Sequence, residues 1–351
     1  MKPLFDYLSG FYRPDEFPAL AAQMERWRTE RPFAGRKLLD GTPVFRNTLV
    51  KYLALLEGGA ELTVSAGAGI PADPEVLQLL PRFGVRVADD AARRDCYDVV
   101  MDCAGAHRGT PARYGRVELT RSGLEYYRNF LDPVFSADSG RIKVIETGLG
   151  TGDGFQRGME QLGFLEFAGR RVVIFGCGKV GTGVAVHALW LGAEVVVVDD
   201  SARVTPPAGA TIVDLGDRAG IDRALRGAWC MVSCTGLRGA LEGKFDAAAL
   251  VASPTLIVNM GVEDEFGSAI PAERVLNGKR PLNFILEEPT RLCYIDPTMA
   301  LDNAGALEVL EGKLPPGISL PPAALEAEIL ETVRRRGRIA PELEKMEGFF
   351  A

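Results

Sequence analysis

One stretch, RVVIFGCGKVGTGVAVHALWLGAEVVVVDD at residues 171–200, constrains the fold more than any other part of the chain. An apolar β-branched run at 172–175 leads into glycines with G-x-G-x-x-G spacing. Apolar residues at helical spacing follow at 180–191, and a second apolar run at 195–198 ends at Asp199. This order predicts a strand, a tight turn, a helix and a second strand, which together open a dinucleotide-binding fold.

Each glycine of the motif has a mechanical role in such a fold. Gly176 permits the tight turn, Gly178 lets the backbone approach a pyrophosphate, and Gly181 lets the helix pack on the strand. The pyrophosphate is expected at the helix N-terminus, where unpaired N–H groups and the helix dipole favour an anion. Asp199 follows near the spacing of about 20 residues at which a carboxylate binds the ribose hydroxyls. We therefore predict NAD as cofactor, with NADP left as an alternative by Arg203.

Alternating strand and helix patterns extend to both sides of this stretch. They predict an α/β protein of two domains, a doubly wound NAD-binding Rossmann domain inserted in an α/β substrate domain. The expected boundaries are 1–150 for the first part of the substrate domain, 151–292 for the Rossmann domain, and 293–351 for a C-terminal helical segment that returns to the substrate domain.

The patterns also predict individual elements. Strands are expected at 61–64, 85–87, 97–101, 142–147, 211–213, 230–233, 256–259 and 281–284. Helices are expected at 48–56, 75–80, 123–130, 155–162, 222–225 and 247–251, and 294–351 is expected to be mostly helical. Asp302 and Asn303 precede an alanine-rich apolar run, which predicts that they cap a helix there.

Composition excludes several classes of partner. A net charge of −7 argues against nucleic acid and against an anionic membrane surface. The sequence has neither a signal-like apolar segment near its start nor a run of about 18 apolar residues, so we expect no membrane span and a cytoplasmic location. The 6 cysteines form no C-x-x-C pair, which predicts reduced cysteines and no metal site.

Histidine is scarce, with only 2 in the chain, although acid–base chemistry near neutral pH often uses it. His107 lies in the loop AGAHRG after a predicted strand, where open α/β sheets place ligands, so it is a candidate for substrate contact. His187 lies within the helix that follows the glycine turn, and its position predicts a packing role.

A second glycine loop, ETGLGTG from Glu146 to Gly152, is similar to the E-x-G-x-G-x-G loop of S-adenosylmethionine-dependent methyltransferases. That fold requires an acidic residue at the end of the next strand. Here the next strand ends in the Gly176 turn, which is itself a cofactor loop, so the methyltransferase interpretation is disfavoured.

The order of the motifs resembles the S-adenosylhomocysteine hydrolase family over roughly residues 35–310. NTLVKYLALLEGGAELTVSA is similar to the family's TAVLIETL…GAEV segment, VVMDCAGA to its ILDDGGD strand end, and VELTRSG to its EETTTG motif. Beyond the glycine turn, SCTG is similar to T-x-T-G, and VNMGVEDEFG is similar to CNIGHFDxEID. The resemblance implies tightly held NAD, transient oxidation of the substrate, and a homo-oligomer.

The resemblance also implies which residues contact the cofactor. Thr120 and Ser122 would lie near the nicotinamide. The glycine motif itself predicts one more contact, Gly178. The other contacts that the resemblance implies are Gly176, Lys179, Val180, Gly181, Asp199, Thr235, Gly236, Met260 and Gly261.

The catalytic half departs from the family pattern. Two family histidines fall on Pro43 and Val262, and the family's lysine–aspartate pair corresponds at best to Lys143 and Glu146. On a strand, that spacing would put these two side chains on opposite faces. The family's strand-end aspartate falls beside Asp102, and its substrate-binding glutamate falls beside Glu118. The acid–base candidates are Asp102, His107, Glu118, Lys143 and Glu146, and the acidic run 263–265 is either a further set or a solvated loop.

These departures favour an NAD-dependent enzyme that transfers a hydride on a small polar substrate other than S-adenosylhomocysteine. Three alternatives stay open. One is an amino-acid or hydroxy-acid dehydrogenase, for which Arg46, Arg121 and Arg291 are possible carboxylate clamps. The others are a non-catalytic NAD-binding regulatory protein and a true S-adenosylhomocysteine hydrolase.

Overall fold

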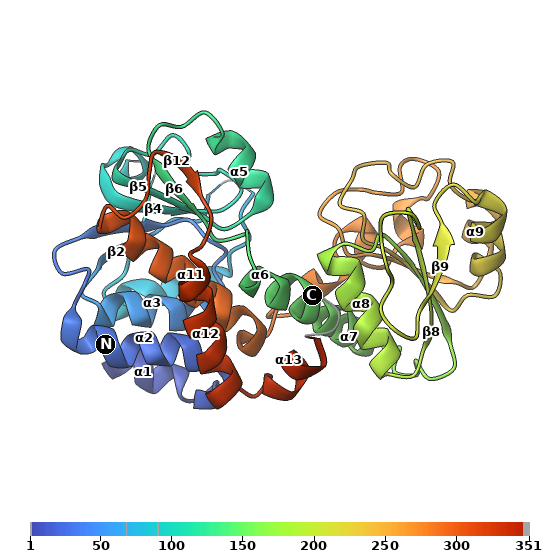
Figure 1. Cartoon of the computed structure of the whole chain (residues 1–351), viewed down its shortest axis with the longest axis horizontal. Coiled ribbons are helices and arrows are strands. Elements are labelled where there is room, and N and C mark those ends of the chain that lie inside the picture. The colour runs from blue at the N-terminus through green and yellow to red at the C-terminus, as the bar shows by residue number, and fades with distance from the viewer. Residues whose placement is uncertain (1, 68, 90, 347–351) are drawn as a thin grey trace. The chain divides into compact units, whose positions relative to one another are not determined.

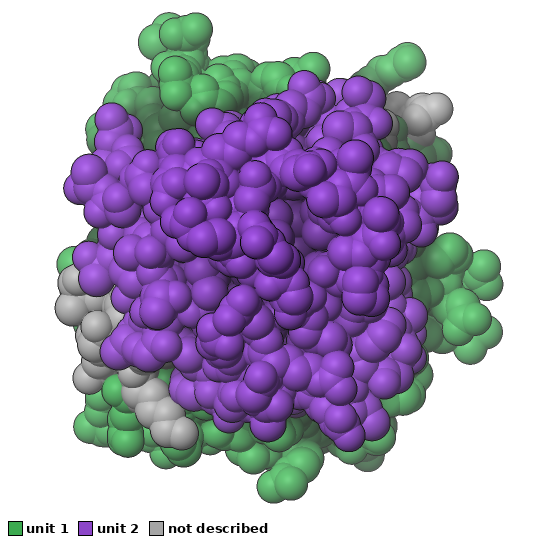
Figure 2. Space-filling view, turned by 90° about the vertical axis from the view of Figure 1, so that its right-hand side faces the viewer, with its two compact units in different colours: residues 1–143, 292–345 green, residues 144–291, 346–351 purple. Residues whose placement is uncertain are grey.

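The chain forms two compact units in a computed structural model that describes residues 2–67, 69–89 and 91–346 (Figure 1). Unit 1 comprises residues 1–143 and 292–345, and unit 2 comprises residues 144–291 and 346–351. Figure 2 colours unit 1 green and unit 2 purple. The α/β class with a Rossmann unit, predicted from the glycine stretch, is confirmed.

Unit 1 is built on a seven-stranded sheet with the order β12-β6-β5-β4-β1-β2-β3. All neighbouring strands pair in parallel. The sequence order reverses between β1 and β4, and such a reversal in a doubly wound sheet creates a crevice at the carboxyl ends of the strands. The strands are β1 (Lys37–Asp40), β2 (Glu61–Val64), β3 (Arg86–Val87), β4 (Tyr97–Asp102), β5 (Ala112–Glu118), β6 (Pro133–Ser136) and β12 (Gly317–Ser319).

Helices from both ends of the chain complete unit 1. Helix α11 packs on β4, β5 and β6 and also contacts α2 and α3. Its Asp296 accepts hydrogen bonds from the main-chain N–H groups of Ala19 and Leu20, both 2.9 Å long, and so caps the start of α2. The helices are α1 (Lys2–Leu8), α2 (Pro18–Glu30), α3 (Thr48–Glu57), α4 (Pro74–Leu79), α5 (Arg121–Tyr127), α6 (Ile142–Val144), α11 (Leu292–Leu310), α12 (Ala323–Arg336) and α13 (Ala340–Met346).

Unit 2 is a five-stranded parallel sheet with the order β11-β10-β7-β8-β9, and its sequence order reverses between β7 and β10. The strands are β7 (Arg171–Phe175), β8 (Glu194–Asp199), β9 (Thr211–Asp214), β10 (Cys230–Ser233) and β11 (Leu256–Asn259). The helices are α7 (Thr151–Gln161), α8 (Lys179–Trp190), α9 (Arg218–Leu225) and α10 (Ala247–Ala252), with short 3-10 turns at Ala272–Arg274, Leu276–Lys279 and Leu282–Ile285.

The segment expected as a strand at 142–147 is helical, so that prediction is wrong. A π-helix, Ile145–Gly150, follows α6 and continues into α7. Close packing of these helices on α8 requires glycine at two positions, because a Cβ at Gly183 of α8 would overlap the carbonyl of Gly148, and one at Gly152 of α7 would overlap the carbonyl of Gly183. Tertiary contact between two helices thus outweighs the low helix propensity of glycine.

Two further expectations near the C-terminus are also wrong. The segment at 281–284 forms the turn Leu282–Ile285 rather than a strand, since Pro281 precedes it with an extended backbone and leaves no donor for a ladder. Asp302 and Asn303 lie in the middle of α11, fully buried, and do not cap a helix. The interruption at LPPGISLPP contributes the edge strand β12, and residues 347–351 lie outside the described part of the chain.

Candidate functional site

The glycine turn after β7 has the geometry that a dinucleotide needs. Gly176 has a positive φ of 96°, which favours glycine. A Cβ at Gly178 would meet no atom within 4 Å, so its exposed backbone is open to a ligand. A Cβ at Gly181 would overlap the carbonyl oxygen of Gly176, so only glycine lets α8 start this close to the turn. Lys179 and Val180 form the first turn of α8, whose N–H groups point toward this opening.

Asp199 ends β8 beside the turn and is tied to it. Its carboxylate accepts hydrogen bonds from the main-chain N–H of Cys177 at 2.5 Å and of Asp200 at 2.7 Å. Each oxygen accepts one of these bonds and so keeps capacity for a ribose hydroxyl. Because Asp200 lies next to it and pairs with Arg203 at 3.1 Å, the local charge disfavours the 2′-phosphate of NADP. These residues fit NAD.

The loop after β10 carries the predicted contacts Thr235 and Gly236, and it is organised by Glu265. The Glu265 carboxylate accepts the N–H and the hydroxyl of Thr235, both at 2.8 Å, and the N–H of Gly236 at 2.7 Å. Glu265 is fully buried, so the interpretation of 263–265 as a solvated loop does not hold for it. Glu263 pairs with Arg238 and Asp264 with Lys279.

The end of β11 supports the same region. Asn259 accepts hydrogen bonds from the Ser233 hydroxyl and from the N–H of Gly261, both at 2.9 Å, and thereby joins the ends of β10 and β11. Met260 is buried in the core of unit 2. A Cβ at Gly261 would overlap the Glu265 carboxylate, so the glycine is required by that side chain.

In unit 1, polar residues end four neighbouring strands. In sheet order from β6 to β1 they are Ser136, Glu118, Asp102 and Asp40, all with 0% exposure. Asp102 pairs in register with Glu118, and Glu118 with Ser136. Asp40 and Asp102 flank the switch between β1 and β4, which is where an open sheet binds its ligand.

Asp102 is held by its own loop. It accepts hydrogen bonds from the Tyr127 hydroxyl and from the N–H groups of Cys103 at 2.8 Å and His107 at 2.9 Å. Burial raises the pKa of Asp102 above its ordinary range, against the opposing effect of these donors. Tyr127, which sequence reasoning missed, is fully buried, and its pKa is raised by burial and then by the Asp102 charge.

Glu118 occupies the end of the next strand and organises the predicted nicotinamide contacts. It accepts the N–H and the hydroxyl of Thr120 at 2.8 and 2.7 Å, and the N–H groups of Ala104 and Gly105 at 3.0 and 3.2 Å. Burial raises the pKa of Glu118 to about 7. Thr120 caps α5, and Ser122 is exposed with its hydroxyl 3.4 Å from that of Thr120. Glu118 is therefore poised to hold or release a proton near neutral pH.

The two histidines are both buried but differ in position. His107 lies against the switch point of unit 1, because a Cβ at Gly41 or Gly67 would crowd its ring. Burial lowers the pKa of His107, and its Nε2 has no hydrogen-bond partner among the described residues. His187 packs in α8 of unit 2 as predicted for a core residue, and burial lowers its pKa to about 4.

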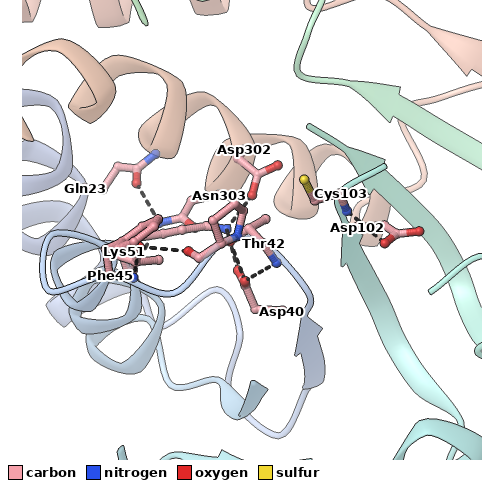
Figure 3. Close-up of polar contacts among 11 residues, drawn as sticks. Gln23, Asp40, Thr42, Phe45, Lys51, Asp102, Cys103, Asp302 and Asn303 are labelled. Atoms are coloured by element: carbon pink, nitrogen blue, oxygen red, sulfur yellow. Dashed lines mark hydrogen bonds and ion pairs between the residues drawn. The ribbon is translucent and has the colours of Figure 1, made fainter. Parts of the chain in front are cut away.

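A buried ion cluster that sequence reasoning missed lies beside Asp40 (Figure 3). Lys51 of α3 pairs with Asp40 and, at 2.5 Å, with Asp302 of α11, and it contacts the Thr42 hydroxyl at 3.2 Å. Burial by itself would lower the pKa of Lys51. The negative charges of Asp302 and Asp40 outweigh the effect of burial, so the pKa of Lys51 is raised. The available signal was a lysine in the otherwise apolar run NTLVKYLALLE, a position that requires a buried partner.

Lys143 and Glu146 fall on consecutive helical segments, not on a strand. Lys143 lies in unit 1, where it is buried and its charge lowers the pKa of Asp302, although burial keeps that pKa raised overall. Glu146 is half-buried in the π-helix of unit 2. Only Lys143 thus belongs to the ion cluster of unit 1. Of the three arginines considered as clamps, Arg291 pairs with Asp153 at 3.4 Å and Arg46 stacks on Phe11.

Comparison with known proteins agrees with this geometry. A family described as "Putative NAD(P)-binding" matches residues 164–260, which lie in unit 2. The adenosylhomocysteinase of Thermoplasma acidophilum is 26% identical over 70% of this chain and 66% of its own length, just under two thirds. The S-inosyl-L-homocysteine hydrolase of Methanopyrus kandleri is 25% identical over 90% of this chain and 87% of its own. At this low identity, the chain is similar to adenosylhomocysteinases and to an S-inosyl-L-homocysteine hydrolase.

The family match supports NAD as the cofactor of unit 2. Among solved structures, a dipicolinate synthase chain from Bacillus halodurans aligns over 78% of this chain and 99% of its own with a TM-score of 0.49 and 14% identity. Within the described residues, no helix has both the length and the apolar character needed to cross a membrane.

Proposed function

We propose that this adenosylhomocysteinase-like protein transfers a hydride between NAD and a small polar substrate other than S-adenosylhomocysteine. One observation carries the proposal: the switch point of unit 1 is lined by buried acid–base groups on neighbouring strand ends, Asp40, Asp102 and Glu118. Burial raises the pKa of Asp102 and of Glu118, and groups with shifted pKa concentrate at catalytic sites.

The substrate distinction rests on two positions. Pro43 and Val262 stand where the resemblance implies histidines, and neither can carry a proton. Val262 is 82% exposed, and the carbonyl of Pro43 is engaged by the Thr48 hydroxyl at 2.9 Å. The acid–base set of this chain is therefore chemically different from that of the family, which favours a different substrate.

In the proposed reaction, the residues of unit 1 have separate roles. Bound NAD supplies the hydride acceptor for oxidation at an alcohol or amine carbon. Glu118, with a pKa of about 7, exchanges the accompanying proton, and the Lys51 ammonium stabilises negative charge that develops on a substrate oxygen. Asp102 positions His107 and Tyr127 around the same switch point.

The test begins with an absorbance scan of the purified protein near 340 nm, followed by release and mass analysis of the cofactor. The protein is then incubated with S-adenosylhomocysteine, S-inosylhomocysteine, and panels of nucleosides, thioethers, hydroxy acids and amino acids. The proposal expects turnover of one panel compound well above S-adenosylhomocysteine, and loss of that turnover in Glu118→Gln.

Other outcomes decide between the alternatives. S-adenosylhomocysteine as the best substrate would contradict the proposal and identify a true hydrolase. Net NADH formation with a hydroxy or amino acid would identify a dehydrogenase. Bound NAD that no panel compound reduces would favour a non-catalytic NAD-binding protein.

A further inference from the structure

Glu265 of unit 2 is a buried carboxylate for which the described residues provide no cation. The two acids before it each have one, since Glu263 pairs with Arg238 at 2.7 Å and Asp264 with Lys279 at 2.8 Å. Glu265 has 0% exposure and forms no ion pair with any described residue. A buried charge is costly unless it is paired, so the missing partner needs an explanation.

Hydrogen bonds explain why the carboxylate is tolerated but do not remove its charge. Three donors bind it, the N–H and hydroxyl of Thr235 and the N–H of Gly236. These donors are neutral dipoles, and they leave a full negative charge in the loop. Asn259, which accepts the N–H of Gly261 at 2.9 Å and donates to the carbonyl of Glu263, holds the same loop in place.

This charge lies beside the cofactor crevice of unit 2. Thr235 and Gly236 lie in the loop that follows β10, and β10 flanks the switch between β7 and β10. The loop touches the glycine turn, because a Cβ at Gly176 would lie 2.7 Å from the carbonyl oxygen of Cys234. A dinucleotide bound at such a switch point lies across these two loops.

We propose that Glu265 selects the oxidation state of the bound cofactor, favouring NAD⁺ over NADH. The nicotinamide ring of NAD⁺ carries a positive charge, and the dihydronicotinamide of NADH is neutral. A fixed negative charge with no cation of its own stabilises the oxidised form and leaves the reduced form unaffected. The inference rests on the proposed function only through its cofactor.

The preference has a consequence for turnover. When the protein binds NAD⁺ more tightly than NADH, the reduction potential of the bound cofactor falls by linkage. A hydride taken from a substrate is then more readily returned, and the cofactor resists accumulating in its reduced form. Glu265 would thus favour a cycle in which oxidation is transient.

The experiment compares the dissociation constants of NAD⁺ and NADH for wild type and Glu265→Gln, by calorimetry for NAD⁺ and by fluorescence for NADH. Wild type should bind NAD⁺ at least as tightly as NADH. In Glu265→Gln the preference for NAD⁺ should fall by about 10-fold, as expected for loss of one charge about 12 Å from the ring at an effective dielectric constant of about 20. Glu263→Gln, in the same loop but paired with Arg238, should leave the ratio within about 2-fold of wild type.

Thr235→Val separates the charge from the shape of the loop. It removes one hydrogen bond to Glu265 but keeps the carboxylate, so it should weaken both cofactor forms equally. An unchanged ratio of the NAD⁺ and NADH dissociation constants in Glu265→Gln would overturn the inference. So would a wild-type protein that binds NADH about 10-fold more tightly than NAD⁺. If the variant does not fold, the wild-type measurement decides. NAD⁺ preference without turnover of any panel compound would contradict the proposed function alone, and binding of neither form would contradict both.

Discussion

Both units place a crevice where the strand order of a parallel sheet reverses, but backbone forms it in unit 2 and side chains form it in unit 1. Each has a parallel sheet whose strand order reverses once, between β1 and β4 in unit 1 and between β7 and β10 in unit 2. In unit 2 the crevice is formed mainly by backbone, through glycines that bring a helix N-terminus and a turn together. In unit 1 it is formed by side chains, with carboxylates on successive strand ends. A backbone site leaves a short motif in the sequence, and a side-chain site does not.

The difference also predicts how each unit fails. A backbone site depends on the absence of atoms, so added atoms should damage it. A side-chain site depends on matched charges, so removing one partner should damage it more than removing both. The following predictions are ordered from the largest expected effect to the smallest.

The largest effect on cofactor binding is expected from Gly181→Ala in unit 2. The added methyl group would overlap the carbonyl of Gly176 and push α8 away from the turn. We expect NAD affinity to fall by at least about 100-fold, as for loss of several aligned donors at about 1.5 kcal/mol each, measured by calorimetry. Gly178→Ala is the matched control, because its Cβ has open space. It should keep the wild-type melting temperature, and an equal loss of stability in both variants would break the contrast.

In unit 1, Lys51→Met should destabilise the fold by about 3–5 kcal/mol, because it leaves the buried carboxylates of Asp40 and Asp302 without their cation. Lys51→Met combined with Asp302→Asn should recover part of that loss, which urea unfolding would measure. Asp98→Asn is a control on the amino-terminal half of the same sheet, where Asp98 pairs with the more exposed Arg113. A double variant less stable than Lys51→Met would show that the cluster is not governed by charge balance.

Glu118 of unit 1 and His187 of unit 2 should respond to pH in opposite directions. Glu118 has a raised pKa of about 7, so its stabilising contribution is present below its unfolded pKa near 4.5 and is lost as pH rises through 7. His187 has a lowered pKa of about 4, so its contribution is present above 6.5 and is lost as pH falls toward 4. Each shift corresponds to at most about 3 kcal/mol.

Unfolding of wild type, Glu118→Gln and His187→Asn between pH 5 and 8 would test this. The stability of wild type relative to Glu118→Gln should decrease with rising pH. Relative to His187→Asn it should increase with rising pH. Parallel pH profiles for all three proteins would contradict both assignments.

The smallest effect concerns Thr120, which caps α5 and donates its hydroxyl to Glu118. Thr120→Ala should cost about 1 kcal/mol, and Thr120→Ser should cost less because the hydroxyl is kept. If Thr120 also lies near the nicotinamide, as the resemblance implies, Thr120→Ala should in addition weaken NAD binding. Calorimetry on the two variants separates the structural role from the cofactor role.

Much of unit 2 followed from the sequence. Strands β10 and β11 have the predicted bounds, and the glycine turn and Asp199 take the positions that their spacing indicated. Such features depend on neighbours in the chain, whose geometry is local. The prediction failed at 142–147, where an apolar stretch next to glycines suggested a strand, and packing of Gly148 against Gly183 selects a helix instead.

The site of unit 1 could be predicted only in part from the sequence. His107 was recognised because it follows a predicted strand, and Asp102 and Glu118 because they lie beside positions that the family resemblance implies. Asp40, Lys51 and Tyr127 were not recognised. Asp302 was assigned to a helix cap although it lies inside α11, because its partner Lys51 is distant in the sequence. Likewise, nothing local shows that Glu265 binds the Thr235 loop, while Glu263 and Asp264, with the same chemistry, pair with Arg238 and Lys279.

The sequence by itself thus determined the fold class, the cofactor turn and the acid that follows it, because these depend on period, spacing and the absence of a side chain. Only the tertiary structure decided which polar residues are buried, which cation each carboxylate meets, and which groups are left to a ligand. The physical reason is that desolvation and charge pairing depend on atoms that the fold brings together from distant parts of the chain, as it brings Asp40, Lys51 and Asp302 into one cluster.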